Sequence, residues 1–300
     1  MAFEIVIYQR RLAPSLSVAL CLCLLAACSS KNEGAASLRT VTDEYGREVR
    51  INPRPERIVS LAPSITETLY ALGLGDRVVG VTTYCDYPPE AKQKEQVGDT
   101  LRPSVEKIVA LKPDLVIIST ASQLESFVRK LEEIKIPVYI SNPRNLEGVL
   151  RSIEAIGEIS GAPDRGRELS LALRARVEAI QSRVAGRGRP RVFLLLGGNP
   201  LITAGRDAFV TDMINRAGGR SISDDETADY PQYSLETAVA RQPEVILLQA
   251  GEESLPQGLR QTPAALAGHV YHLDDDLLLR PGPRIVDGLE QMAAKIHPVD

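Results

Sequence analysis

The chain has 300 residues, of which 44% are hydrophobic and 25% charged, and its formal net charge is −4. This length is enough for two α/β domains that each bury a core, and the weak negative charge gives no electrostatic reason to expect a nucleic-acid partner. The absence of Trp and the aromatic content of 4% argue against a broad stacking surface for bases or sugars.

Residues 1–27 have the pattern of an export signal. Arg10 and Arg11 form a positively charged region, and residues 16–25 form an apolar run that is too short for a membrane span of ~20 residues. The tetrapeptide LAAC that ends at Cys28 resembles the lipobox of bacterial lipoproteins. The resemblance implies that Cys28 is lipidated and anchors an extracytoplasmic protein to the inner or the outer membrane.

Residues 28–40 are then a lipidated, flexible tether, because their first part is small and polar. Cys21 and Cys23 would be removed with the signal and Cys28 would be lipidated, so Cys85 is the one cysteine of the folded part. No structural disulfide is therefore expected within the mature chain.

Residues 41–160 predict a first α/β lobe in which strands and helices alternate. The expected elements are a hairpin at 41–51, strands at 57–61, 78–81, 115–118 and 138–140, and helices at 64–72, 105–112, 123–133 and 146–159. Ser64 and Glu67 have the spacing of a capping box for the first helix. Short connections between alternating strands and helices indicate a parallel sheet with helices on both faces.

Residues 161–189 predict one long linking helix. Leu169, Leu173, Val177 and Ile180 recur at intervals of three and four from 163 to 185, and Gly186 follows. Because ~20 residues of helix span about 30 Å, we expect a stiff connection between two lobes.

Residues 190–300 repeat the plan of the first lobe. The expected elements are strands at 191–196, 245–248 and 270–273, helices at 207–216, 235–242 and 284–295, a tight turn at 197–200, and loops at 228–233 and 274–283. The sequence therefore predicts two similar α/β lobes with parallel central sheets, joined by one long helix.

The two lobes share a repeated segment. Residues 104–118 read SVEKIVALKPDLVII, and residues 234–248 read SLETAVARQPEVILL. Each copy begins with a Ser that can cap a helix and places Glu106 or Glu236 in the first turn. We expect both helix starts to lie opposite the carboxyl ends of the strands.

Several motifs together resemble a known family of transport proteins. The segments RIVSLAPSITETLYALG, CDYPPEA, SVEKIVALKPDLVI and RPGPRIVDGLE occur in this order, with the long helix between the last two. From about residue 57 to 300 the chain is similar to the periplasmic binding proteins of ABC importers, in the cobalamin, haem and ferric-siderophore group, and most similar to the cobalamin-binding branch. The resemblance implies a ligand cleft between two lobes, no catalysis, a membrane permease as partner and ATP hydrolysis elsewhere.

The resemblance also implies a role for the repeated carboxylates. Glu106 and Glu236 match the tip carboxylates that dock on arginines of the permease, and two charges a fixed distance apart would set the register on a two-fold partner. The alternative is that both are only favourable first-turn carboxylates of their helices.

The expected ligand-binding residues follow the strand ends and the family match, because ligands of such sheets lie outside the carboxyl ends of the strands. They are Pro63, Ser64, Tyr84, Asp86, Thr100, Ser119, Asn199, Tyr230, Asp276 and Arg280. The two tyrosines could pack on a flat macrocycle, and Arg280 could pair with an acidic or amide periphery or only with nearby aspartates.

The chain departs from the cobalamin-binding pattern at positions where relatives have Trp, which are Thr100, Ser119 and Leu277 here, with Tyr230 replacing another. Cobalamin, a related cobamide, cobinamide, haem or a ferric siderophore are therefore all open as ligands. The chain is expected to be a monomer with no resident cofactor.

Three other functions fit the sequence less well. A bare metal ion fits poorly, because His269, His272 and His297 have no accompanying carboxylate cluster and Cys85 is a lone residue. Glu106 and Glu236 could be the acid/base pair of a glycoside hydrolase, but such a pair must be roughly 5 to 10 Å apart across a cleft. Both helix starts are expected to lie away from the cleft, so this function fits poorly. An adhesion or scaffold module would need neither a cleft nor a repeated tip carboxylate.

Overall fold

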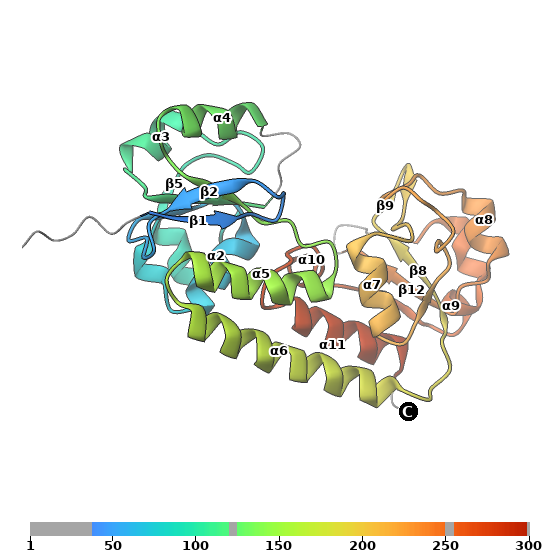
Figure 1. Ribbon diagram of the computed structural model, residues 1–300. Coiled ribbons are helices and arrows are strands. Elements are labelled where there is room, and N and C mark those ends of the chain that lie inside the picture. Colours follow the sequence, from blue (N-terminus) through green and yellow to red (C-terminus); the bar gives the residue numbers. More distant parts are fainter. Residues whose placement is uncertain (1–37, 120–124, 250–254, 299–300) are drawn as a thin grey trace, which may run out of the picture. The chain divides into compact units, whose positions relative to one another are not determined.

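The computed structural model describes residues 38–119, 125–249 and 255–298 (Figure 1). The signal peptide, Cys28, the first part of the tether and the predicted helix start at Gln123 lie outside the described residues. Along the part that is described, no helix combines the length and the apolar content that a membrane crossing requires.

The first lobe contains a five-stranded sheet and a separate hairpin. The hairpin pairs β1 (Arg39–Thr42) with β2 (Glu48–Ile51) in antiparallel fashion, as predicted. The sheet has the order β5-β4-β3-β6-β7, and every pair in it is parallel. Its strands are β3 (Ile58–Ser60), β4 (Val78–Val81), β5 (Glu95–Gln96), β6 (Leu115–Ile118) and β7 (Val138–Ile140).

Helices cover both faces of this sheet, which confirms the predicted layering. They are α2 (Pro63–Ala71), α3 (Val105–Ala110), α4 (Glu125–Glu133) and α5 (Leu146–Ile159), with short 3-10 turns at Gly75–Arg77 and Pro89–Gln93. Side chains alternate along β6, so Ile117 joins the core under α2 and α5 whereas Val116 and Ile118 join the core under α3 and α4.

The predicted capping box of α2 is wrong. The N-cap residue is Ala62, no side chain caps the helix, and Pro63 occupies its first turn. Ser64 lies inside the helix and is buried, while the buried Glu67 carboxylate accepts hydrogen bonds from Arg284. A partner far away in the sequence therefore displaces the local contact that the spacing suggested.

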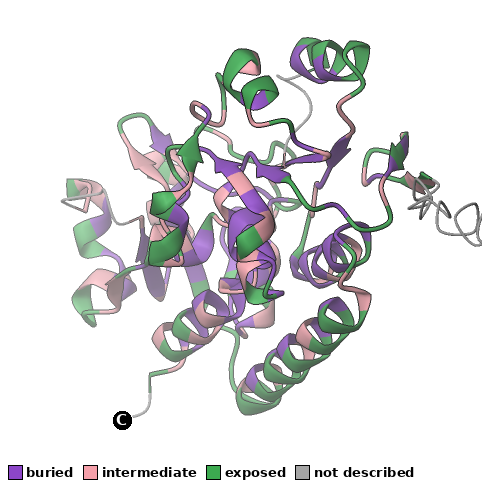
Figure 2. Cartoon of the chain, turned by 90° about the vertical axis from the view of Figure 1, so that its left-hand side faces the viewer, coloured by how far each residue is buried: buried purple, intermediate pink, exposed green. Residues whose placement is uncertain are grey.

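The long helix forms as predicted. α6 (Pro163–Val184) buries Leu173, Val177 and Ile180 along one stripe and exposes the opposite face, as Figure 2 shows. It packs against α5 of the first lobe and against α11 (Ile285–Ile296) of the second (Figure 1). α6 thereby links the two lobes along its length.

The second lobe contains a four-stranded parallel sheet of order β11-β8-β12-β13. Its strands are β8 (Arg191–Leu195), β11 (Arg220–Ser221), β12 (Val245–Leu248) and β13 (Val270–His272), and a small hairpin of β9 (Gly197–Gly198) and β10 (Leu201–Ile202) forms the predicted tight turn. Its helices are α7 (Phe209–Arg216), α8 (Leu235–Ala240), α9 (Pro263–Leu266), α10 (Asp275–Leu278) and α11, with a 3-10 turn at Gln257–Gln261.

One predicted loop of this lobe contains a helix instead. The sequence predicts a loop at residues 274–283, but the first part folds into α10. The N-cap residue Asp274 accepts a hydrogen bond from the backbone N–H of Asp276 at 2.9 Å. The Asp side chain satisfies a helix-end donor, which explains why a charged segment becomes helical.

A buried cluster extends across the predicted end of the first lobe. Leu150 and Ile153 of α5 share one core with Leu173 of α6, Met213 of α7 and Leu289 of α11. One core therefore continues through the predicted limit at residue 160. The predicted lobe limits, 41–160, 161–189 and 190–300, stay predictions.

The two copies of the repeated segment fold alike. Ser104 and Ser234 cap α3 and α8 by accepting hydrogen bonds from Lys107 N and Thr237 N. Each copy then turns at the residue before Pro, and Lys112 and Gln242 have φ angles of 47° and 49°. The prediction of one α-then-β unit in each lobe is confirmed.

Candidate functional site

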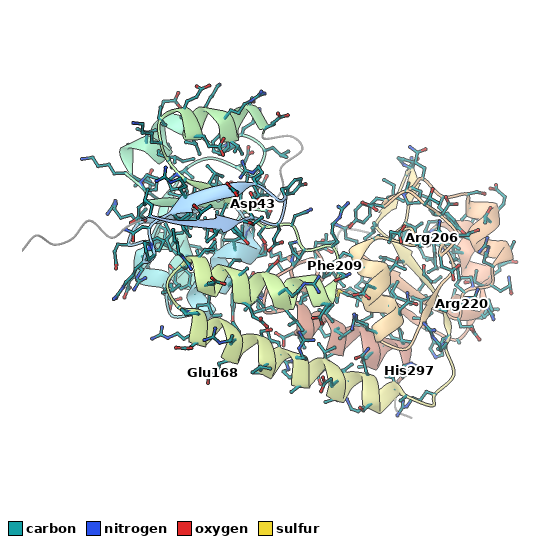
Figure 3. All side chains as sticks on the ribbon, viewed as in Figure 1. Asp43, Glu168, Arg206, Phe209, Arg220 and His297 are labelled. Carbon is teal, nitrogen blue, oxygen red and sulfur yellow. The ribbon has the colours of Figure 1, made fainter. Side chains whose placement is uncertain are left out.

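A cavity of about 200 Å³ has walls from both lobes. The first lobe contributes residues 142–144, which follow the carboxyl end of β7, and the second contributes the start of α7 and the loop with Tyr230. Phe209, at the start of α7, is labelled in Figure 3. The lining residues are Asn142, Pro143, Arg144, Asp207, Ala208, Phe209, Val210, Asp229, Tyr230, Leu278, Leu279 and Pro281.

Tyr230 is the sequence-predicted site residue that lines this cavity. Its side chain is 52% exposed, so part of the ring is open to a ligand. Burial and the neighbouring Asp229 carboxylate raise the pKa of the Tyr230 hydroxyl, and the Arg144 guanidinium opposes this rise. The hydroxyl is therefore a neutral hydrogen-bonding group at physiological pH.

Three other predicted residues meet in an ion cluster. Arg280 donates to Asp86 Oδ1 at 2.6 Å and pairs with Asp276 Oδ1 at 2.7 Å. The hydrogen bond from Arg280 holds the pKa of the Asp86 carboxyl below its usual value. Arg280 is only 15% exposed and also lies 3.5 Å from Glu67 Oε1. The positive charge of Arg280 is therefore already compensated by carboxylates of the protein.

A second arginine extends this cluster. Arg284 binds both oxygens of Glu67, with Nε to Oε2 at 2.9 Å and an amino nitrogen to Oε1 at 2.6 Å. The guanidinium carbon lies 3.9 Å from the ring centroid of Tyr87, within the range of a cation–π contact. Because Glu67 is on α2 and Arg284 immediately precedes α11, the pair connects the first lobe to the start of the last helix.

Two of the predicted serines lie beneath the cavity. Ser64 and Ser119 line a small void of about 10 Å³, which shares Pro143 and Pro281 with the larger cavity. A void of this size accommodates about one water molecule. Both serines therefore line a space that adjoins the cavity.

The remaining predicted residues line neither of these two spaces. Tyr84 is 59% exposed in its loop, and Asn199 is exposed in the turn between β9 and β10. Thr100 is half-buried after β5, and Pro63 begins α2.

Sequence reasoning missed several cavity residues, chiefly Asn142, Arg144, Phe209, Asp229 and Leu279. A usable signal existed for the first two, since they follow the strand β7, and the rule that ligands lie beyond strand carboxyl ends applies to them as well. Phe209 and Leu279 carried no such signal.

Cys85 is part of the core. Its side chain is 3% exposed, and its sulfur accepts a hydrogen bond from Thr66 Oγ1 at 3.1 Å and lies 3.2 Å from Thr82 Oγ1. Across the described ranges, no three His, Cys, Asp or Glu side chains gather in a way that could hold a metal ion.

The repeated carboxylates are exposed at the first turns of α3 and α8. Ser104 Oγ donates to Glu106 at 3.1 Å, and Ser234 Oγ donates to Glu236 at 2.8 Å. A hydrogen bond from its own backbone N–H and then the one from Ser104 lower the pKa of Glu106, whereas the Ser234 hydroxyl is the main cause of the lowered pKa of Glu236. Both are therefore ionised at neutral pH, and neither lines the cavity.

The prediction that these two helices start opposite the carboxyl ends of the strands is wrong. Ser104 N donates to Val97 O, and Val97 N donates to the carbonyl of Val81, the last residue of β4. α3 therefore begins at the carboxyl end of the strands. In the second lobe, Tyr233, which precedes the cap of α8, donates to Leu201 in the hairpin that follows the end of β8.

Residues 58–277 match the model of the periplasmic binding protein family. The chain belongs to this family. It is 34% identical over 270 residues to the uncharacterized ABC transporter substrate-binding lipoprotein YvrC of Bacillus subtilis, covering 86% of this chain and 85% of that protein.

Solved structures support the same assignment. The periplasmic vitamin B12 binding protein BtuF of Vibrio cholerae is 33% identical with a TM-score of 0.71, covering 81% of this chain and 96% of that one. The periplasmic heme-binding protein RhuT from Roseiflexus sp. RS-1 is 32% identical with a TM-score of 0.73, covering 81% and 98%. The predicted two-lobed fold and family are thereby confirmed.

These relationships make the chain a substrate-binding component of an ABC importer, which binds a small ligand and works with permease subunits. Proteins of this family are transport components without catalytic activity, so the glycoside hydrolase alternative is wrong.

Proposed function

We propose that the chain captures cobalamin or a related corrinoid between its two lobes and delivers it to a membrane permease. The observation that carries the proposal is the cavity whose walls come from both lobes, with the partly exposed Tyr230 ring in it. An aromatic face with a neutral hydroxyl suits a flat macrocycle with a polar edge. Relatives named for vitamin B12 support the ligand class.

The proposed ligand-contacting set keeps the residues expected from the sequence and adds the cavity walls. Asp86, Asp276 and Arg280 form the ion cluster beside the cavity, and Tyr230 forms part of its wall. Pro63, Ser64, Tyr84, Thr100, Ser119 and Asn199 complete the set at the strand ends. A cavity of about 200 Å³ is smaller than the ~300–1,000 Å³ of usual ligand pockets, so the loops that carry Tyr230 and Arg144 must separate around a corrinoid.

Haem or a ferric siderophore is the second candidate ligand class. The similarity to a heme-binding relative, at 32% identity, is close to that for the vitamin B12 binding protein, at 33%. The Tyr230 hydroxyl favours this candidate, because a phenol oxygen can ligate haem iron.

The proposal includes a lipid anchor and an extracytoplasmic location. The LAAC tetrapeptide supports lipidation at Cys28, and the relative YvrC is named as a lipoprotein. The anchored chain would act as a monomer, with the permease as its protein partner. Glu106 and Glu236 would dock on cationic residues of that permease, because both are exposed and ionised.

Calorimetric titration tests the ligand assignment. The mature chain from residue 28, with Cys28→Ser to prevent lipidation, is titrated with cyanocobalamin, dicyanocobinamide, haemin and a ferric siderophore. We expect one-to-one binding of cyanocobalamin. Binding of haemin or the siderophore alone would keep the carrier role and reject the corrinoid, and no binding to any of them would reject both ligand classes.

A further inference from the structure

Two arginines, Arg144 on the cavity wall and Arg280 next to the cavity-lining Pro281, differ in their ion pairs. Arg280 is paired with Asp86 and Asp276 and lies close to Glu67. Arg144 is exposed on the cavity wall and forms no ion pair with any residue of the described ranges. It is the one cation among the described residues that line the cavity. The free positive charge of the site is therefore on Arg144.

The backbone that carries Arg144 is fixed from the first lobe. Glu44, in the turn of the β1–β2 hairpin, accepts hydrogen bonds from the backbone N–H of Asn142 at 2.5 Å and from the hydroxyl of Ser152 at 2.5 Å. Its backbone N–H also donates to Ile140 O at 3.1 Å. The hairpin thus holds the segment that leads from β7 to Arg144.

The same segment is fixed from the second lobe. Asn145 caps α5 by accepting from Gly148 N at 2.8 Å, and the backbone N–H of Leu146 donates to Asp212 Oδ2 on α7 at 3.0 Å. Arg216 holds that aspartate, with its Nε 3.0 and 2.9 Å from the two oxygens. Arg144 therefore projects from a backbone that both lobes hold, although its own side chain is exposed.

We propose that Arg144 is a specificity-determining residue that binds an anionic oxygen group on the periphery of the ligand. This inference rests on the proposed function. The group is the phosphodiester of a complete cobamide or the carboxylate of a haem, which share the charge and the hydrogen-bond acceptors that a guanidinium recognises. Two carboxylates, Asp207 and Asp229, also line the cavity and oppose such a group, so the balance of these three charges sets the preference.

Paired ligands test the inference. Cyanocobalamin contains the phosphodiester and dicyanocobinamide lacks it, while haemin has free carboxylates and its dimethyl ester has none. A hydrogen bond to a charged group corresponds to roughly tenfold or more in affinity. We expect Arg144→Gln to weaken cyanocobalamin binding by about tenfold and dicyanocobinamide binding by less than about twofold. If the chain binds haemin, the same variant should weaken haemin binding by about tenfold and binding of the dimethyl ester by less than about twofold.

Two further variants separate charge from structure. Arg151→Gln is the matched control, because Arg151 is an exposed arginine of α5 that does not line the cavity. It should leave all affinities unchanged. Asp229→Asn removes one of the two opposing carboxylates that line the cavity and should strengthen binding of the anionic member of each pair. Added salt should weaken cyanocobalamin binding to the native chain more than to Arg144→Gln, because exposed charges are screened.

The outcomes distinguish this inference from the function on which it rests. If the native chain binds cyanocobalamin or haemin and Arg144→Gln binds both members of each pair as the native chain does, Arg144 has no role in recognition. Equal losses for both members of a pair would also overturn the inference, because the effect would then not depend on the anionic group. A native chain that binds none of the four ligands would reject both the ligand class and the inference.

Discussion

Glu67 joins parts of the chain that are far apart in the sequence. Its carboxylate is 2% exposed and binds Arg284 in two places, with Arg280 also close by. A buried carboxylate is tolerated because it is paired with positive charges. Removing its charge would take one negative partner from both Arg284 and Arg280.

Glu67→Gln should strongly destabilise the fold. The change keeps the size of the side chain, but the charge of Arg284 loses its main partner in a buried setting. Breaking such a pair lowers the free energy of unfolding by about 3–5 kcal/mol, which urea denaturation followed by circular dichroism would measure.

Glu168→Gln is the control for this prediction. Glu168 is exposed on α6, as Figure 3 shows, and an exposed substitution usually changes stability by no more than about 0.5 kcal/mol. If Glu67→Gln were as mild as this control, the ion cluster would not stabilise the fold.

The same residue shows a limit of prediction from sequence. Ser64 and Glu67 have the spacing of a capping box, and that local pattern suggested a local contact. The structure pairs Glu67 with Arg284 instead, because folding brings α2 beside the segment before α11. No pattern along the chain encodes such a contact.

At the scale of elements, α5 and α6 approach closely at two glycines. A Cβ on Gly157 would lie 2.8 Å from the Cα of Gly166 and 3.0 Å from the carbonyl oxygen of Ala162. Both obstacles are backbone atoms, which cannot rotate away as a side chain can. The close contact between these helices therefore depends on glycine, which has no side chain, at both positions.

Gly157→Ala should weaken this helix pair. Overpacking costs about 1–3 kcal/mol, which exceeds the gain of at most about 1 kcal/mol from the better helix propensity of Ala. We expect a lower unfolding midpoint in urea. Gly188→Ala is the control, because nothing lies within 4 Å of a Cβ there. A midpoint for Gly157→Ala above that of the native chain would contradict the close packing.

Elements whose signals are local were predicted well. The repeated helix–strand units have their Ser caps in place, and α6 follows its apolar stripe. The short helix α10 was missed, although Asp274 is a good cap, because the prolines and glycine that follow it favoured a loop. The prediction of the strand end at which α3 begins was also wrong, because that position depends on the path of the chain after β4.

At the scale of the whole molecule, the two-lobed architecture could be predicted and the cavity only in part. The order of strands and helices, together with the family motifs, indicated the lobes and their linking helix. Arg144 and Tyr230 line the same cavity although they belong to loops of different lobes, and their positions in the sequence do not reveal this.

Capture and delivery belong to separate parts of the molecule in this account. The proposed ligand lies in the cavity, whereas Glu106 and Glu236 are exposed at the first turns of α3 and α8 and do not line it. The hydrogen bonds that lower the pKa of both carboxyls keep them charged at neutral pH and in mild acid, as the proposed docking requires.

The most direct measurement compares corrinoid affinity with corrinoid uptake in one double variant, Glu106→Ala with Glu236→Ala. Affinity is measured by calorimetry, and uptake of labelled cyanocobalamin is measured in cells in which the variant replaces the native chain. The control is Glu168→Ala with Glu178→Ala, which removes two exposed carboxylates from α6. We predict unchanged affinity and abolished uptake for the docking variant, and unchanged values for the control. Normal uptake, or a loss of affinity, in the docking variant would contradict the account.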